Sequence, residues 1–418
     1  MLLLSLAYHS LKNRLLTTVL TVLSIALSVA LLIGVENVRV GARESFSNTI
    51  SQTDLIVGAR GGSLQLLLYA VFHIGSATNN LSYSSYEHWK NHPAVRWTIP
   101  YSLGDSHRGF RVVGTDKNFY EHYRYRRDKS IRFSAGRAPE SVFDAAIGSD
   151  VAQKLGYQVG QKVTITHGLG GMIEHNTKPF TIVGIIDRTA TPVDRSVYIP
   201  LEGISAVHVD WQDGAPPMPG EEIAADKITK EQLKVENITA FLVRFKTRLA
   251  VLQLQRNINE YADEPLSAVI PGVVLAELWA TIGYAEDALR VVTFFVLIVG
   301  LLGMLVSLYT SLNERRREMA IFRALGAGPA KIISLLVFES AILSFLGCVL
   351  GLGIVYGLSF ALQPVVERQF GLYLPIQAPT PTSLMYLGGV MIAGILIGFV
   401  PAWKAYRNTL SDGLSVRL

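Results

Sequence analysis

Cysteine, charged residues and low-complexity sequence are all scarce in this chain of 418 residues. One cysteine excludes an intrachain disulfide, so the chain is not a disulfide scaffold. Charged residues make up 17% of the chain, against about 25% in a typical soluble domain, whereas hydrophobic residues make up 50%. This hydrophobic content also argues against intrinsic disorder. The composition therefore disfavours a purely soluble protein and favours a membrane protein that also carries globular structure.

Motifs of nucleotide hydrolysis and of hydrolytic catalysis are missing as well. No string has the G-x-x-x-x-G-K-[ST] spacing of a P-loop, and the glycine-rich residues 326–331 lack the Gly-Lys pair. Neither a G-x-S-x-G elbow nor an H-E-x-x-H pair occurs. We therefore expect that the chain is not an enzyme and binds no cofactor itself. A membrane-anchored enzyme is the least favoured interpretation.

The histidines do not form a recognisable metal-binding motif. His88 and His92 are four residues apart, but Pro93 follows at once, which favours surface histidines. His167 and His175 flank a glycine-rich stretch that we interpret as a hairpin loop. Loop histidines without a defined ligand spacing are mostly structural or solvated. The sequence therefore predicts no metal site.

Four long apolar runs are the strongest feature that is present. They cover residues 15–35, 291–312, 332–356 and 384–400. A transmembrane helix needs about 17–25 mostly apolar residues, so each run can cross a bilayer. The first run is longer than the apolar core of a signal peptide, which spans about 7–15 residues, so we interpret it as a retained anchor. Four buried core helices are the disfavoured alternative.

Basic residues beside these runs predict the orientation of the chain. The formal net charge is +5. The segment 313–331 is net positive, as is the C-terminal tail, whereas the segment 363–383 is neutral and reads as a loop. Because cytoplasmic segments carry an excess of Lys and Arg, we expect both termini and residues 313–331 in the cytoplasm, with residues 36–290 on the outer side of the membrane. Basic and aromatic residues do not interleave as in a single-strand binder, so no nucleic acid is expected as a partner.

The outer segment reads as a mixed α+β region. Short β-branched runs bounded by Gly, Asp or Pro predict strands at residues 54–58, 110–114, 145–148, 162–166, 180–186, 196–199, 238–245 and 267–270. Helices are predicted at residues 82–91, 149–155 and 248–261. The expected fold class is a membrane protein with four transmembrane α-helices plus a large extracytoplasmic α+β domain inserted between the first and second helices.

The chain is expected to divide into four parts. These are an amphipathic lead with the first transmembrane helix (1–38), the periplasmic α+β domain (39–285), the other three transmembrane helices (286–410) and a cytoplasmic tail (411–418). Within the periplasmic domain, residues 40–104 and 236–285 form one subdomain, and residues 105–235 form a β-rich insertion with a linker. The second transmembrane helix is expected to begin near Val274, before the lipid, and so to connect stiffly to the outer domain.

A short amphipathic helix is predicted at residues 314–327, between the second and third runs. Met319, Phe322 and Leu325 form one apolar stripe, and Gly326 ends the helix. The other faces carry Glu314, Arg315, Arg316, Glu318 and Arg323. Such a stripe lies against lipid or against a partner. An interfacial helix and a docking helix for a cytosolic partner are both open at this point.

Small residues and one acid lie within the predicted spans. Glu339 is the acid placed within a span, a costly and often functional position, although near a helix end it can reach headgroup water instead. Glycine pairs suit close helix packing or provide flexibility. The pairs are Gly347 with Gly351 and Gly394 with Gly398.

The apolar segment 64–74 of the outer region is too short to span a bilayer. It contains Leu66, Leu67, Leu68 and Phe72. Two interpretations are open. The segment is a buried core helix of the outer domain, or it presents a surface that touches lipid or a lipidated substrate.

Several of these motifs resemble the membrane domain of MacB/FtsX-type ABC transporter permeases. Residues 314–327 are similar to the family's E-R-x-x-E-[IM]-[AG]-x-x-[RK]-A-L-G-A signature, and residues 401–405 to its P-A-x-x-A tail. Glu339 and the pair Gly347 and Gly351 resemble the early acid and G-x-x-x-G of the following helix. The order of one span, a large outer domain and three spans also matches. In contrast to MacB, we expect a stand-alone permease without a fused ATPase domain.

The resemblance implies a permease subunit whose partner, a separate cytoplasmic ABC ATPase, binds ATP and Mg. The implied ATPase-coupling residues are Glu314, Arg315, Arg316, Glu318, Met319, Phe322, Arg323, Leu325 and Gly326. ATP-driven motion would pass to the periplasmic domain, for export or extraction of a hydrophobic, lipid-linked or peptide substrate. Further implied partners are a second identical or related permease, membrane lipids, and a periplasmic adaptor or lipoprotein. The alternative is an FtsX-like signalling protein that activates a periplasmic partner without transport.

Overall fold

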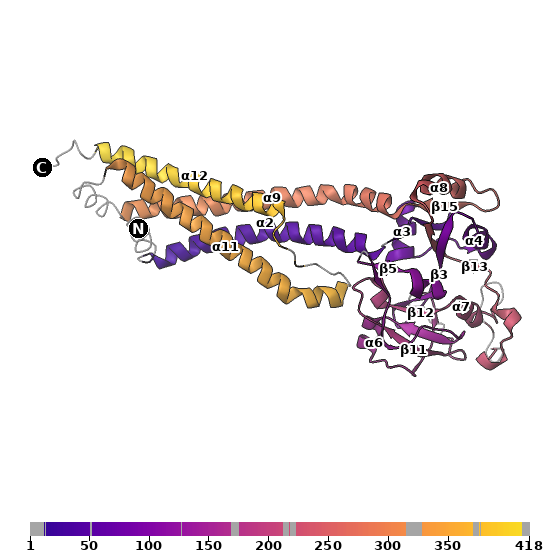
Figure 1. Cartoon of the computed structure of the whole chain (residues 1–418). Coiled ribbons are helices and arrows are strands. Elements are labelled where there is room, and N and C mark those ends of the chain that lie inside the picture. Colours follow the sequence, from indigo (N-terminus) through magenta and orange to yellow (C-terminus); the bar gives the residue numbers. More distant parts are fainter. Residues whose placement is uncertain are drawn as a thin grey trace. The chain divides into compact units, whose positions relative to one another are not determined.

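The computed structural model of the chain separates into two compact units (Figure 1). It describes residues 12, 14–50, 52–126, 128–168, 175–211, 217, 223–314, 328–370, 376 and 378–411. The helical unit consists of Met1–Gly41, Ile282–Val365 and Leu374–Leu418, and the α+β unit consists of Ala42–Thr281 and Val366–Tyr373.

Four long helices contain the four apolar runs, which confirms the predicted spans. They are α2 (Leu15–Thr49), α9 (Pro271–Glu314), α11 (Pro329–Phe370) and α12 (Pro381–Ser411). Each contains a window long and apolar enough to cross a membrane. A helix satisfies every backbone hydrogen bond within itself, which is what a segment in hydrocarbon requires. The chain is therefore a membrane protein in which an α+β region is inserted between the first and second spans.

The helices are longer than the apolar runs. At about 1.5 Å per residue, α9 with its 44 residues measures about 66 Å, twice the hydrocarbon thickness of a bilayer. The predicted early start of this helix near Val274 is confirmed. The predicted loop at residues 363–383 is wrong in its first part, because α11 continues through Pro364 to Phe370. A proline removes one backbone hydrogen bond of the helix, and the apolar residues on either side continue the helical pattern.

The α+β unit is built on one large mixed sheet. The strand order is β15-β1-β14-β3-β4-β12-β8-β11-β7, with β10 paired to β3 and β9 paired to β11. The strands are β1 (Leu55–Ala59), β3 (Val95–His107), β4 (Phe110–Thr115), β7 (Phe133–Gly136), β8 (Asp144–Ile147), β9 (Lys162–Val163), β10 (Thr166–His167), β11 (Phe180–Ile186), β12 (Ser196–Pro200), β14 (Ala240–Phe245) and β15 (Leu266–Val269). Every strand predicted from a β-branched run is present, at least in part. Two ribbons stand apart from the sheet, pairing β2 (Leu81–Ser82) with β13 (Asn237–Ile238), and β5 (Arg124–Tyr125) with β6 (Lys129–Ser130).

The long strand β3 connects the two halves of this sheet. From Val95 to Tyr101 it pairs antiparallel with β14, and from Ser102 to His107 with β4. Its last residues also pair with β10. Strands from both ends of the unit's sequence therefore lie on one side of β3, together with the short β10, and the other strands of the intervening insertion lie on the opposite side.

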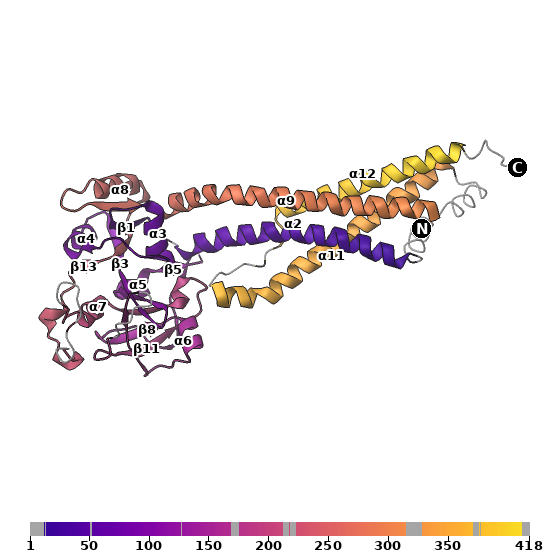
Figure 2. The ribbon, with the colours of Figure 1, turned by 180° about the vertical axis from the view of Figure 1, so that it is seen from behind.

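In the described part of the unit, six short α-helices pack on the sheet (Figure 2). They are α3 (Ser63–Phe72), α4 (Tyr83–Lys90), α5 (Lys117–His122), α6 (Ser149–Leu155), α7 (Leu201–Val207) and α8 (Val251–Asn259). The predicted helices α4, α6 and α8 are confirmed. Gly156 ends α6 in the left-handed conformation, with φ +69°, which glycine adopts at little cost. The helices α5 and α7 were not predicted, because each is under two turns long and lacks a clear amphipathic period.

Three separate apolar cores hold the α+β unit together. The first surrounds α3 and includes Ile56, Ile99 and Leu242 of the sheet. The second lies between the sheet and the helices α4 and α8, and the third belongs to the insertion around β8, β11 and β12. The first core is the one that involves the long helices.

Candidate functional site

The ends of α2 and α9 are part of the first core of the α+β unit. Val274 and Leu275 of α9 are buried in it, and Trp279 packs against it. Phe46 of α2 contacts the Trp279 ring edge-to-face, with ring centroids 5.6 Å apart, and the Phe72 ring at 4.7 Å. The guanidinium of Arg43 lies 5.4 Å from the centroid of the Trp279 ring. The two helix ends are therefore packed on each other and on α3.

The last turn of α2 is also held by a hydrogen bond from the sheet region. Tyr123, at the end of α5, donates its hydroxyl to the carbonyl of Thr49 at 2.7 Å. The last carbonyls of a helix lack a partner within the helix, so this bond satisfies one of them. Burial raises the pKa of Tyr123 above its usual value, which keeps the hydroxyl protonated as a donor.

The helix α3 is a core helix, as one of the two interpretations of the segment 64–74 has it. Leu66 and Leu67 are 2% and 0% exposed, and Phe72 is also buried. Leu68 is half-buried. The burial of Leu66, Leu67 and Phe72 favours the core interpretation, and contact of the segment with lipid or a substrate stays a prediction.

His73 attaches α3 to the insertion. It takes the left-handed conformation after α3, with φ +55°, and its Nδ1 lies 2.8 Å from Oγ of Ser196 at the start of β12. Burial, with a smaller contribution from the charge of Arg111, lowers the pKa of His73 to about 3. The ring is thus neutral and acts as a structural hydrogen-bonding group between α3 and β12.

Within the helical unit, an ionic cluster connects α2 to α9. Arg39 donates from Nε to Glu36 at 3.0 Å and lies 3.6 Å from Glu286 of α9. Further along, Ser28 donates to the carbonyl of Val296 at 3.3 Å. The two helices run side by side in this unit (Figure 1, Figure 2).

The four glycines named from the sequence lie where helices come close. A Cβ on Gly347 would lie 2.5 Å from Cγ2 of Ile25, and one on Gly351 would lie 2.8 Å from the carbonyl oxygen of Ala26. On α12, a Cβ on Gly394 or Gly398 would overlap Ser344 or Ser340 of α11. Real Cβ atoms do not approach so closely, so these positions require glycine.

Of the remaining site residues predicted from the sequence, Glu339 is described by the structure and the coupling segment is not. Glu339 is 4% exposed, so its side chain lies among the helices of the helical unit. The coupling segment falls outside the described residues, since Glu314 is the last described residue of α9 and its side chain is not described. The prediction for Glu314, Arg315, Arg316, Glu318, Met319, Phe322, Arg323, Leu325 and Gly326 therefore stays a prediction.

Histidines meet in the α+β unit at a place that the sequence did not indicate. His167, His175 and His208 each present a ring nitrogen, and these atoms all lie within 4.8 Å of one another. The sequence pattern predicts a loop at His167 and His175 and gives no signal for His208. His88 is exposed and packs against Tyr261 instead.

Comparison with known proteins identifies the class of this four-span membrane protein. Residues 18–260 match the family described as MacB-like periplasmic core domain, and residues 290–410 match the family described as FtsX-like permease C-terminal. Together the two matches cover both units. The chain belongs to the MacB/FtsX-type ABC transporter permease family.

Individual relatives are similar over parts of their length. "Macrolide export ATP-binding/permease protein MacB 2" of Aeromonas hydrophila is 24% identical over 326 residues, which is 71% of this chain and 42% of that protein. "ABC transporter permease YtrF" of Bacillus subtilis is 28% identical over 127 residues, 28% of this chain and 29% of that protein. The crystal structure of the periplasmic region of MacB from Actinobacillus actinomycetemcomitans aligns with 55% of this chain and 94% of that chain, at 10% identity and a TM-score of 0.34. The chain spans less than half the length of the curated relatives named here.

Burial of Leu67 in the first core predicts a large effect of its truncation. We expect Leu67→Ala to destabilise the protein by about 2–5 kcal/mol, because it removes buried methyl groups and leaves a cavity. Thermal unfolding of the full chain in detergent measures this. Leu64→Ala is the matched control on the same helix, since Leu64 is 37% exposed. Equal melting temperatures of the two variants would contradict the core assignment.

The close approach at Gly351 predicts a contrast between two glycines of α11. Gly351→Ala should cost about 1–3 kcal/mol, because the added methyl group meets the backbone of α2. Among the described residues, a methyl group added at Gly353 would meet no atom within 4 Å beyond its own stretch of helix, so Gly353→Ala should be neutral or stabilising. Melting temperatures in one detergent compare the two. A Gly351→Ala protein as stable as Gly353→Ala would rule out tight packing there.

Proposed function

We propose that this chain is a permease subunit that transmits ATP-driven motion from a separate cytoplasmic ATPase to its α+β unit. The observation that carries this proposal is the shared packing of the α2 and α9 ends in the first core. Phe46 of α2 contacts both the Trp279 ring of α9 and the Phe72 ring of α3, with ring centroids less than 6 Å apart. A displacement of either helix end would therefore displace the core of the sheet with it, because interiors are close-packed.

Both helices are unbroken from the apolar run to this core. The helix α2 has 35 residues and α9 has 44. Within the helical unit they are connected by Arg39 and Glu286 and by the bond from Ser28 to Val296. A pair of continuous helices that are connected along their length is suited to carrying a mechanical displacement.

We propose that the ATPase that causes this displacement lies in the cytoplasm. The positive segment 313–331 and the positive tail favour a cytoplasmic location of both termini, with the α+β unit on the outer side of a bacterial inner membrane. There the stripe of Met319, Phe322 and Leu325 would dock on the ATPase, which binds ATP and Mg. Two permease copies, or two related permeases, would pair with two ATPase subunits.

The proposal includes the kind of substrate. An α+β unit that is moved by its supporting helices would act on molecules at the outer face of the inner membrane. We propose export or extraction of a hydrophobic, lipid-linked or peptide substrate. A periplasmic adaptor or lipoprotein would receive it.

The docking stripe predicts the effect of adding charge to it. The double variant Met319→Asp and Leu325→Asp should no longer co-purify the ATPase, because two carboxylates would be buried without partners in the interface. The measurement is the amount of ATPase that a tagged permease retains from detergent-solubilised membranes.

Two controls accompany this experiment. Arg317 lies outside the apolar stripe, so Arg317→Ala should leave the association with the ATPase unchanged. Membrane insertion of each variant is checked by its resistance to carbonate extraction. Full ATPase retention by the double Asp variant would overturn the docking assignment.

Transmission through α9 predicts that softening this helix uncouples the α+β unit. The double variant Thr281→Gly and Ile282→Gly creates three successive glycines with Gly283. Each glycine costs a helix about 1 kcal/mol relative to alanine and adds backbone freedom. We expect the variant to keep ATPase association and hydrolysis but to lose the change in amide hydrogen exchange at α3 when the ATP-bound state is trapped.

The matched control is Thr281→Ala with Ile282→Ala, which removes the same side chains and keeps the helix stiff. This pair should show the wild-type exchange response. If the glycine pair also shows it, α9 is not the transmitting element. If wild type shows no response at α3, the proposed transmission itself is wrong.

A further inference from the structure

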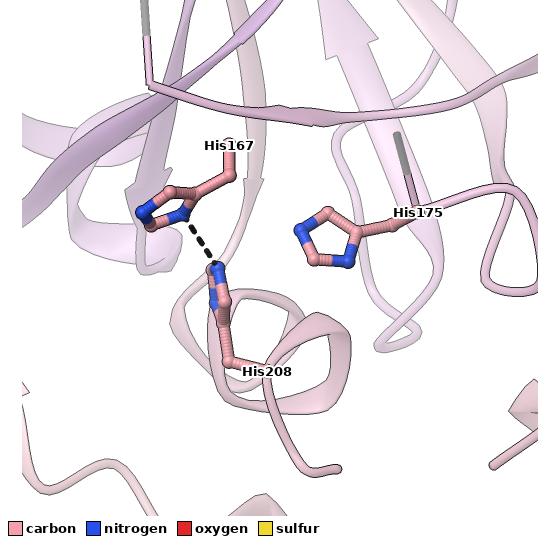
Figure 3. Close-up of side chains that lie close together, drawn as sticks. All are labelled: His167, His175 and His208. Atoms are coloured by element: carbon pink, nitrogen blue, oxygen red, sulfur yellow. Dashed lines mark hydrogen bonds between the residues drawn. The ribbon is translucent and has the colours of Figure 1, made fainter. Parts of the chain in front are cut away.

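His167 and His175, which are near each other in the sequence, converge with the more distant His208 at one place in the α+β unit (Figure 3). Nδ1 of His167 lies 3.2 Å from Nε2 of His208. His175 completes the group, with its ligand nitrogen within 4.8 Å of the other two. In the close-up, the three rings surround a common space. This arrangement has no part in the packing of α2 and α9, so it requires its own explanation.

The fold brings each ring to this place through regular backbone pairing. His167 on β10 lies directly opposite Asp105 on β3. The amide of His175 donates to the carbonyl of Ile165 at 2.9 Å, which holds it beside β10. His208 is the residue that ends α7. Defined secondary structure therefore anchors all three positions.

Two of the rings present a nitrogen lone pair. Nδ1 of His208 lies 2.9 Å from the carbonyl oxygen of Ile204 and donates to it, which leaves Nε2 as an acceptor facing the cluster. A second hydrogen bond of this kind is what orients metal-binding histidines. His175 is 7% exposed, and its Nε2 has no hydrogen-bond partner among the described residues.

Asp105 adds a buried carboxylate to the group. It is 2% exposed, and its Oδ1 lies 3.2 Å from Nδ1 of His167 and 3.8 Å from Nε2 of His208. Ligand atoms bound tetrahedrally at about 2.0–2.1 Å are separated by about 3.4 Å. The spacing of these three atoms is close to that of one face of such a tetrahedron. The carboxylate also supplies negative charge that would compensate a cation.

The described surroundings contain a paired cation and an aromatic reporter. The buried Lys178 is paired with Asp210 through a contact of 2.6 Å. The Trp211 ring packs against all three histidines, with centroid distances of 4.6 Å, 5.6 Å and 5.0 Å to His167, His175 and His208. A bound metal would therefore lie next to an indole whose fluorescence responds to it.

We propose that His167, His175, His208 and Asp105 form a binding site for a divalent transition metal of the zinc class. Three imidazoles and one carboxylate are a donor set that suits Zn²⁺ in tetrahedral geometry, and imidazole ligands also accept Cu²⁺, Ni²⁺ and Co²⁺. Binding displaces any proton on Nδ1 of His167 to solvent. The metal would connect β10 to the end of α7. This site goes beyond the proposed transmission function and does not depend on it.

The test uses the full chain, purified in detergent with a tag that contains no histidine and stripped with a chelator. Titration with ZnCl₂ in a calorimeter and metal analysis after dialysis should give about one bound Zn²⁺ per chain. Co²⁺ should give the intense visible absorption of a four-coordinate complex. Cu²⁺ should quench the fluorescence of the wild type more than that of Trp211→Phe. Zn²⁺ should also raise the melting temperature, because it binds the folded state.

Variants assign the binding to this cluster. His175→Ala and His208→Ala should abolish the stoichiometric site, and Asp105→Asn should weaken it by about 10–100-fold. His88→Ala with His92→Ala removes two histidines outside the cluster and should bind as wild type does. The metal-free melting temperatures of all variants show whether they are folded, and the Co²⁺ spectrum of the wild type requires no variant. The proposal is overturned if the wild type shows no saturable binding or no four-coordinate Co²⁺ spectrum, or if folded His175→Ala and His208→Ala proteins still bind one metal.

Discussion

The hydrogen-bonding requirement of a backbone in lipid is the constraint on which the rest of this structure depends. It forces each apolar run into a helix, and a helix once formed continues until something stops it. In α2 and α9 nothing stops it at the end of the apolar run, and both continue into the core around α3. Phe46 and Trp279 then make the spans structural elements of the α+β unit. The proposed mechanism uses this continuity and requires no catalytic group in the chain.

In the α+β unit, one continuous strand likewise connects two parts of the structure. The long β3 pairs with β14 in its first half and with β4 in its second half, so one strand belongs to both parts of the sheet. His73 makes a second connection between these parts through Ser196. Asp105, near the end of β3, belongs to the histidine cluster. The helix ends pack on a core beneath this sheet, and two residues of the proposed metal site, Asp105 and His167, lie opposite each other on its strands β3 and β10.

Much of the fold could be predicted because its signals are local. Length and hydropathy identify the spans, and β-branched runs identify β1, β4, β8, β11 and β12. The short helices α5 and α7 escaped prediction, since a helix of under two turns is stabilised by its neighbours and not by its own pattern. The motif of the coupling segment led to the family, which the comparisons then showed. The docking role of the coupling segment depends on the surface of a partner protein, and a pattern within this chain does not describe that surface.

The sequence by itself determined the four membrane helices and the inserted α+β region, because each depends on neighbours along the chain. Tertiary structure decided that Leu66 and Leu67 are core residues, since only the packed sheet shows what covers them. It also decided that His208 belongs with His167 and His175. A set of ligands is defined by distances of a few ångströms in space. Residues from β10, from the segment that begins at His175 and from the end of α7 acquire those distances only when the chain folds.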